Sequence, residues 1–194
     1  MKERPILFNA EMVQAILSGR KTQTRRIALK TNGICPVGRV GDQLWVRETF
    51  SLLGNEDGCA VDWNEKIVTD NKDAARIYKA SCWQKPNNYG IWSVPDCEME
   101  FDGAWTPSIH MPRWASRIDL RITGVRVERL NSITNADAKA EGYPAEREID
   151  GGSTDPWLWF RDLWDGIYPD NTFKVNPCVW VIEFERVAPT GERS

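Results

Sequence analysis

The chain has 194 residues, a length typical of one domain or of one domain with a large insertion. Hydrophobic residues make up 41% and charged residues 27%, which argues against an intrinsically disordered protein. The 25 basic and 28 acidic side chains leave a formal net charge of −3, which argues against a protein that coats nucleic acid with its whole surface. Ten tryptophans are many for this length.

The N-terminal quarter predicts a strand, a helix and two extended segments. Residues 5–8 are an apolar run typical of a short strand. A helix follows, because Asn9 is a good N-cap and apolar residues recur at helical spacing up to Gly19. The Thr- and Arg-rich residues 21–29 favour an extended chain, and a Gly-Asp turn precedes a strand at residues 43–49.

Residues 51–108 show a much weaker pattern. Gly, Pro, Asn and Asp recur there, and only short strand-like pieces, such as residues 75–79 and 90–94, interrupt them. So long a weak region is typical of an insertion or a functional loop. We expect a single domain over residues 1–188 that contains this Trp-rich insertion, followed by a flexible tail at residues 189–194. The rings expected to anchor the insertion are Trp63, Trp83, Trp92 and Trp105.

The second half of the chain predicts strands separated by short helices. The clearest strand begins at Ile118 and moves its apolar residues to the other face across Gly124, which indicates a β-bulge. Helices are expected from Thr134 and from Asp155, an N-cap followed by proline. A strand at residues 178–187 closes the fold. The expected class is α+β, a small bent β-barrel with short flanking helices.

The apolar runs and the cysteines indicate the cellular compartment of the protein. No stretch approaches 18 consecutive apolar residues and the N-terminus does not resemble a secretory signal, so we expect no membrane association and a cytoplasmic location. The five cysteines include no Cys-x-x-Cys pair, which favours reduced thiols. His110 is the only histidine, so we expect no metal site, and no motif indicates a cofactor.

Two stretches are basic within this acidic chain. Residues 20–30 contain five cations and no acid, and residues 113–129 contain five arginines and two acids. If both lined one cleft, the protein would carry a local phosphate-binding groove. The alternative is two solvated strand faces.

Residues 19–26, Gly-Arg-Lys-Thr-Gln-Thr-Arg-Arg, resemble the G-x-K-x-x-(E or T)-x-R signature of ASCH-domain proteins. The resemblance covers residues 4–50 and 108–187, and it implies a PUA-like β-barrel. The match extends to the position of the motif, after one helix and before the Gly-Asp turn and strand at residues 41–48. The longer ASCH-like proteins often carried by phages and prophages are similar in two further segments, residues 110–117 and 138–143.

The residue at position 24 distinguishes two branches of that family. Many ASCH domains carry Glu there and are suspected RNA-binding modules, whereas Thr24 resembles the short ASCH-like amidohydrolases that remove the acetyl group from N4-acetylcytidine. Their catalytic Lys, Thr and Glu correspond to Lys21, Thr24 and Glu141. The resemblance implies an amidohydrolase acting on an acylated nucleobase or nucleoside. The alternative is a non-catalytic RNA-binding module.

These residue types suit amide hydrolysis. A threonine hydroxyl needs an adjacent base before it attacks a carbonyl, and a desolvated lysine with cations nearby can be neutral and accept its proton. Glu141 can orient Lys21, protonate the leaving amine or activate water, and Arg26 can stabilise the oxyanion.

We expect the ligand, a nucleoside or RNA, to contact aromatic and charged side chains near the motif. Aromatic rings can stack on a base, and packing in the core is their alternative role. Glu48 is a second candidate for the catalytic carboxylate. The expected binding residues are Arg26, Trp45, Arg47, Glu48, Arg113, Trp114, Arg117 and Tyr143.

Overall fold

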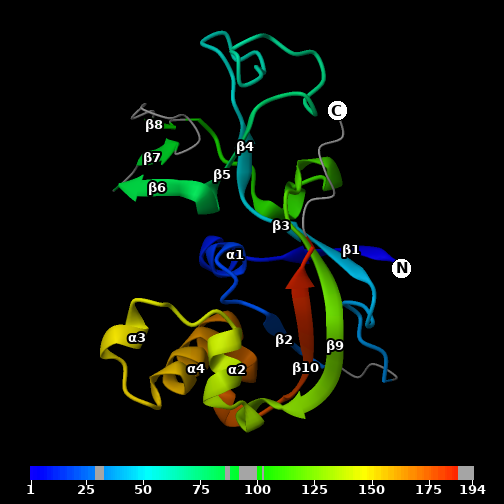
Figure 1. Ribbon diagram of the computed structural model, residues 1–194, viewed down its shortest axis with the longest axis vertical. Helices are drawn as coiled ribbons and strands as arrows, with labels where there is room; N and C mark the ends of the chain where they lie inside the picture. Colours follow the sequence, from blue (N-terminus) through cyan, green and yellow to red (C-terminus); the bar gives the residue numbers. More distant parts are fainter. Residues whose placement is uncertain (29–32, 86–87, 92–99, 102, 188–194) are drawn as a thin grey trace. The chain divides into compact units, whose positions relative to one another are not determined.

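The computed structural model describes residues 1–28, 33–85, 88–91, 100–101 and 103–187 (Figure 1). The chain forms two compact units. The second unit contains the whole of the expected insertion at residues 51–108. The first unit comprises residues 1–4, 15–44 and 118–194, and the second unit comprises residues 5–14 and 45–117.

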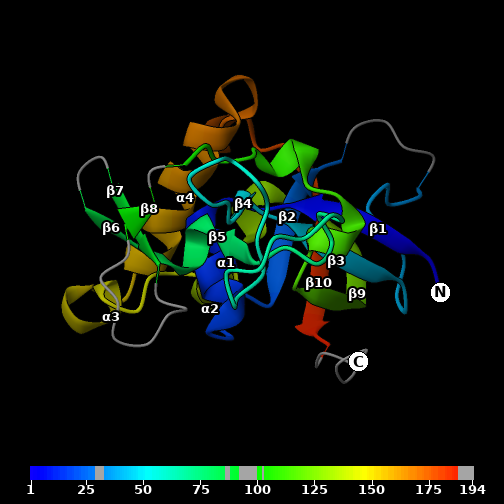
Figure 2. The same ribbon diagram turned by 90° about the horizontal axis from the view of Figure 1, so that it is seen from above.

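The main sheet has five strands in the order β1-β3-β9-β10-β2. They are β1 (Glu3–Leu7), β2 (Gln23–Ile27), β3 (Gln43–Arg47), β9 (Asp119–Arg129) and β10 (Cys178–Arg186). The long antiparallel strands β9 and β10 lie side by side (Figure 1 and Figure 2). The α+β class with flanking helices is confirmed. The sheet is open rather than closed into the expected barrel, because no pairing among the described residues joins its edge strands β1 and β2.

The bulge expected at Gly124 is confirmed. Glu183 of β10 lies opposite Gly124, and the next residue, Phe184, lies opposite Ile122, so β9 contains one additional residue at this point. A Cβ at position 124 would lie 2.4 Å from Glu183 Oε2, so a larger residue here requires the Glu183 side chain to move.

Three helices belong to the first unit: α2 (Asn135–Ala140), α3 (Arg147–Asp150) and α4 (Asp155–Ile167). As expected, α2 begins after Thr134, whose side chain and that of Asp137 form a capping box. The N-cap of α4 is Thr154 and not the expected Asp155, whose carboxylate instead accepts hydrogen bonds from Arg147. The short α3 was not expected. Single 3-10 turns span Leu130–Ser132, Pro169–Asn171 and Phe173–Val175.

One face of β10 packs against α2 and α4. In this core Val179 and Val181 are both fully buried, at 0% exposure. The opposite face of β10 is buried too, so the strand is covered on both sides. The helices and turns contribute Leu130, Ile133, Ala138, Phe160, Trp164 and Phe173 to the same core.

The second unit contains more regular structure than the sequence predicts. Helix α1 (Ala10–Leu17) begins in it, and the expected N-cap Asn9 accepts a hydrogen bond of 2.8 Å from the Met12 amide. Its strands have two to four residues, too few to produce a recognisable periodicity. A two-stranded sheet contains β4 (Phe50–Leu52) and β5 (Arg76–Tyr78), and a three-stranded sheet contains β6 (Cys82–Lys85), β7 (Asn88–Ile91) and β8 (Glu100–Phe101). Its 3-10 turns span Lys79–Ser81, Ser108–His110 and Arg113–Ala115.

The tryptophans of the expected insertion differ in their environment. Trp105 packs edge-on against Phe101, with ring centroids 4.7 Å apart. Trp63 is 51% exposed, so the expectation that it anchors the insertion is wrong. Trp92, the side chain of Trp83 and the expected tail at 189–194 lie outside the described residues. Within the described part of the chain, no helix has the length and apolar character needed to cross a membrane.

Candidate functional site

Lys21 and Glu141 are in direct contact in the interior of the first unit. Lys21 Nζ donates to the Glu141 backbone carbonyl at 2.8 Å and to Glu141 Oε2 at 2.9 Å. Neither residue is more than 4% exposed. The backbones of the two residues also form an isolated antiparallel bridge. The structure therefore joins two positions that are 120 residues apart in the chain and that the family resemblance selects as catalytic.

Arg25 is the second cation on the same carboxylate. Its guanidinium donates to Glu141 Oε1 at 2.9 Å, and it lies 3.5 Å from Glu128 and 3.7 Å from Asp137. Each oxygen of Glu141 thus accepts from a different buried cation. In the sequence, Arg25 stands out only as one of the cations close to Lys21. Side chains alternate along an extended segment, so Arg25 lies on the same face as Gln23. The side-chain amide of Gln23 donates hydrogen bonds to Asp137, a residue of α2, the helix whose C-cap is Glu141.

The turn after α2 allows the close approach of the two segments. Gly142 has φ +104°, a conformation that L residues rarely adopt. A Cβ on Gly142 would lie 2.9 Å from Ala15 Cβ and 3.3 Å from Lys21 Cβ. Glycine at this position thus lets the backbone of Glu141 pair with that of Lys21.

Replacing Gly142 by alanine is expected to lower the free energy of unfolding by about 1–3 kcal/mol, because the new methyl group overlaps its neighbours and the backbone is strained. Urea denaturation measures the change. Gly152→Ala is the matched control: a Cβ there meets nothing within 4 Å, so an effect within about 0.5 kcal/mol is expected. Equal effects in the two variants would contradict the packing argument.

Burial lowers the pKa of the Lys21 ammonium from its ordinary value of 10.5. The carboxylate of Glu141 opposes this shift, while the positive charges of Arg26 and Arg25 add to it. A lysine with a lowered pKa is neutral in a larger fraction of molecules at a given pH, which is the state required of a general base.

The lowered pKa predicts how stability varies with pH. Between the folded-state pKa of Lys21 and 10.5, the unfolded chain binds more protons at this residue than the folded one, so stability rises with pH. The free energy of unfolding of the wild type minus that of Lys21→Met should therefore increase from pH 7 to pH 10 in urea titrations. The same difference for Lys139→Met, a lysine 54% exposed, should stay flat. A difference that falls with pH for Lys21 would refute the prediction.

Thr24 lies in β2 opposite Ile182 and is 1% exposed. Because side chains alternate along a strand, Thr24 and Arg25 lie on opposite faces of β2. It is the Arg25 side chain that contacts Glu141. Arg26, half-buried, shares the Thr24 face, and its guanidinium donates to the Arg25 carbonyl at 3.2 Å. The contact of Lys21 with Glu141 is thus a direct observation, whereas the pairing of Lys21 with Thr24 is implied by the resemblance.

Tyr143 is a packing residue. It is 3% exposed, and its ring packs edge-on against Trp159. Its hydroxyl donates to the Asp155 carboxylate and lies 3.1 Å from the Arg147 carbonyl oxygen. The structure therefore shows the packing role for Tyr143, which was the alternative to stacking on a base.

The remaining expected binding residues belong to the second unit. Glu48, 2% exposed, accepts from Arg117 at 2.8 and 2.9 Å, and this guanidinium lies 4.0 Å from the centre of the Tyr78 ring. Glu48 is therefore held by a bidentate ion pair. The other four residues form two cation–aromatic groups: Arg47 and Arg113 over Trp45, and Arg76 over Trp114.

The structure gives no indication of a metal centre in the residues that it describes. None of their His, Cys, Asp and Glu side chains gather in groups of three or more that could hold an ion. The described cysteines, all of them free thiols, are Cys35, Cys59, Cys82 and Cys178.

Comparison with known proteins yields two structural similarities. No family model and no curated protein matches the chain. The ASCH domain from Lactobacillus crispatus JV V101 is similar with a TM-score of 0.39 and 14% identity, covering 95% of this chain and 79% of that one. A DUF984-family protein from Enterococcus faecalis V583 has a TM-score of 0.41 and 11% identity, covering 100% of this chain and 87% of that one. The similarity concerns the fold and says nothing about activity.

Proposed function

We propose that this chain is an amidohydrolase that acts on a small acylated nucleobase or nucleoside of the N4-acetylcytidine type. The observation that carries the proposal is the buried hydrogen bond between Lys21 and Glu141. The resemblance selects both residues, and a strand-surface lysine and a solvated helix-end carboxylate would have no reason to meet in the interior.

The hydrogen bonds of Lys21 suit a general base. In its neutral form the amine has two N–H donors and one lone pair, and the carbonyl and carboxylate oxygens of Glu141 accept two hydrogen bonds from Nζ. A neutral amine carries one lone pair, and this lone pair is what accepts the proton in base catalysis. Glu141 is the positioning residue, and Arg25 fixes the other oxygen of its carboxylate.

The proposed reaction has two steps. The Thr24 hydroxyl attacks the amide carbonyl and passes its proton to Lys21, and the tetrahedral intermediate expels the nucleobase amine, which takes that proton. Water then hydrolyses the acyl ester on Thr24, releasing the carboxylic acid. Support for Thr24 as the nucleophile comes from the resemblance alone. Because Lys21 and Thr24 are both closed to solvent, a substrate reaches them only when the structure opens.

An RNA-binding module, the alternative function, is not favoured by the arginines of residues 113–129. Most of them are paired with carboxylates: Arg117 with Glu48, Arg121 with Glu185, and Arg126 with Glu128 and Glu183. Arginines neutralised in this way contribute little to a phosphate-binding stripe.

The test is the release of acetate from N4-acetylcytidine and from a panel of other acylated nucleosides and nucleobases, followed by liquid chromatography. Turnover of at least one member is expected. The absence of turnover across the panel at high concentrations of folded enzyme would exclude the proposed function.

A further inference from the structure

A second candidate site lies away from Lys21, in the first unit. A pocket of about 700 Å³ opens between the start of the chain, the segment at residues 33–42, and strands β9 and β10. This volume is within the range of small-molecule sites. Neither Lys21 nor Thr24 nor Glu141 lines it. The inference drawn from this pocket is independent of the proposed function.

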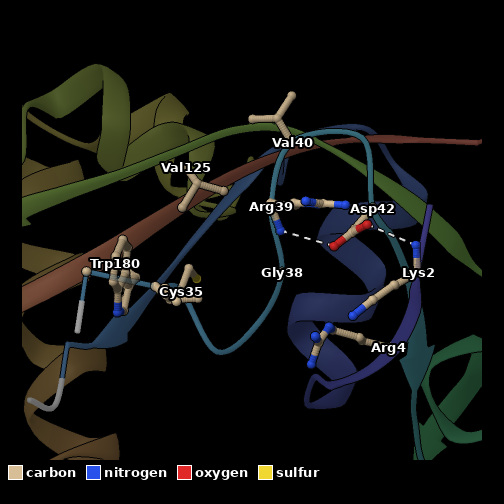
Figure 3. A pocket seen from close by; sticks show the side chains of 11 residues that line it. Lys2, Arg4, Cys35, Gly38, Arg39, Val40, Asp42, Val125 and Trp180 are labelled. Atoms are coloured by element: carbon tan, nitrogen blue, oxygen red, sulfur yellow. Dashed lines mark hydrogen bonds between the residues drawn. The ribbon is translucent and has the colours of Figure 1, made fainter. Parts of the chain in front are cut away.

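One end of the pocket is positively charged. The side chains of Lys2, Arg4 and Arg39 line it together with one acid, Asp42 (Figure 3). The backbone amides of Lys2 and Arg39 donate to the two oxygens of Asp42, and the first of these hydrogen bonds lowers the pKa of the carboxyl group. Within the described structure none of the three cations forms an ion pair, so this end carries a net positive charge.

The other end is apolar and has an unused donor. Trp180, Cys35 and Val125 lie together there, across the pocket from Lys2 and Arg4 (Figure 3). Trp180 is 6% exposed, and its buried Nε1–H finds no acceptor among the described residues. Buried polar groups in folded proteins are nearly always hydrogen-bonded. The buried Nε of Arg4 is another donor without an acceptor in this part of the structure.

We infer that this pocket binds a nucleoside monophosphate. Its phosphate group matches the three cations, which supply charge-assisted hydrogen bonds. Its uncharged ring matches the apolar end, where a carbonyl or ring nitrogen of the base accepts from the Trp180 indole. Inorganic phosphate satisfies only the charged end, and a nucleoside satisfies only the apolar end.

Isothermal titration calorimetry with AMP, CMP, GMP and UMP, with inorganic phosphate, and with the parent nucleosides tests the inference. At least one monophosphate should bind about tenfold more tightly than either of its parts. Arg39→Gln should weaken that binding by about tenfold, since it removes a charged donor, and Trp180→Phe by about fivefold, since it removes only the N–H. Circular dichroism establishes that each variant is folded.

Two further variants test whether binding depends on this pocket or on cations elsewhere in the protein. Arg121→Gln removes an exposed guanidinium of β9 outside the pocket and should leave the affinity unchanged. Lys21→Met should also retain binding, whether or not acetate release is lost. The inference is wrong if the monophosphates bind no better than phosphate alone, if Arg39→Gln and Trp180→Phe have no effect, or if Lys21→Met abolishes binding. It is also wrong if single-stranded oligonucleotides bind and no mononucleotide does.

Discussion

Replacing Glu141 by glutamine is expected to lower the free energy of unfolding by about 3–5 kcal/mol. The substitution conserves the shape of the side chain and removes its negative charge. Lys21 and Arg25 would then lie 0% and 1% exposed without the carboxylate that each now contacts at 2.9 Å. Urea denaturation at pH 7 gives the change directly.

The control for this prediction is Glu148→Gln, which breaks an ion pair with Lys139 on the surface. Both of those side chains are at least half exposed, so a loss of no more than about 0.5 kcal/mol is expected. The double variant Lys21→Met/Glu141→Leu should be less unstable than the sum of its single variants, because it leaves fewer unpaired buried charges. A loss below about 1 kcal/mol for Glu141→Gln would show that water or a rearrangement replaces the carboxylate.

Removing the base or the nucleophile is expected to reduce acetate release far more than any surface substitution. Lys21→Met should lower kcat by about 10²–10⁴-fold, the usual contribution of a general base. Thr24→Val, which keeps the shape of the side chain but has no hydroxyl, should lower it by at least about 10³-fold. Thr24→Ser, which retains a hydroxyl, should keep measurable activity. Initial rates with N4-acetylcytidine at saturation measure all three.

The same series tests the position of Thr24 on the face of β2 opposite Arg25. If Lys21→Met abolishes turnover while Thr24→Val stays within about tenfold of the wild type, then Lys21 and Glu141 activate water directly and the assignment of Thr24 as nucleophile is wrong. Lys139→Met, which removes an exposed lysine of α2, serves as the activity control and should leave kcat unchanged.

Local features of this fold could be predicted because their causes are local. Asn9 and Thr134 begin helices because their side chains each accept a hydrogen bond from the backbone amide three residues later. Gly124 marks a bulge because the apolar residues change face across a glycine, a local pattern that the sequence shows directly. In the second unit, strand-like pieces were predicted at residues 75–79 and 90–94, and β5 (Arg76–Tyr78) and β7 (Asn88–Ile91) lie at or beside them. The strands β4, β6 and β8 were not predicted, since pairing across the sheet stabilises them and no periodic pattern marks them.

The candidate site was predictable in its composition and less so in its arrangement. Lys21 and Glu141 could be paired in advance only through the family motif, because nothing in a linear sequence relates residues 120 positions apart. The place of Arg25 on the same carboxylate depends on the register between β2 and β10. That register is a long-range property, set by which faces of the two strands are buried.

From residue types and spacing alone come the α+β class, the starts of α1 and α2, the bulge and the cationic motif at residues 19–26. Each of these follows from the preferences of neighbouring residues. The folded chain adds the open edge of the sheet, the core position of Tyr143, the two cations on Glu141 and the charged pocket near Trp180. These features depend on which segments, far apart in the sequence, pack against one another and exclude water. Burial lowers the pKa of Lys21, and this lowered pKa makes a lysine beside a glutamate a candidate base.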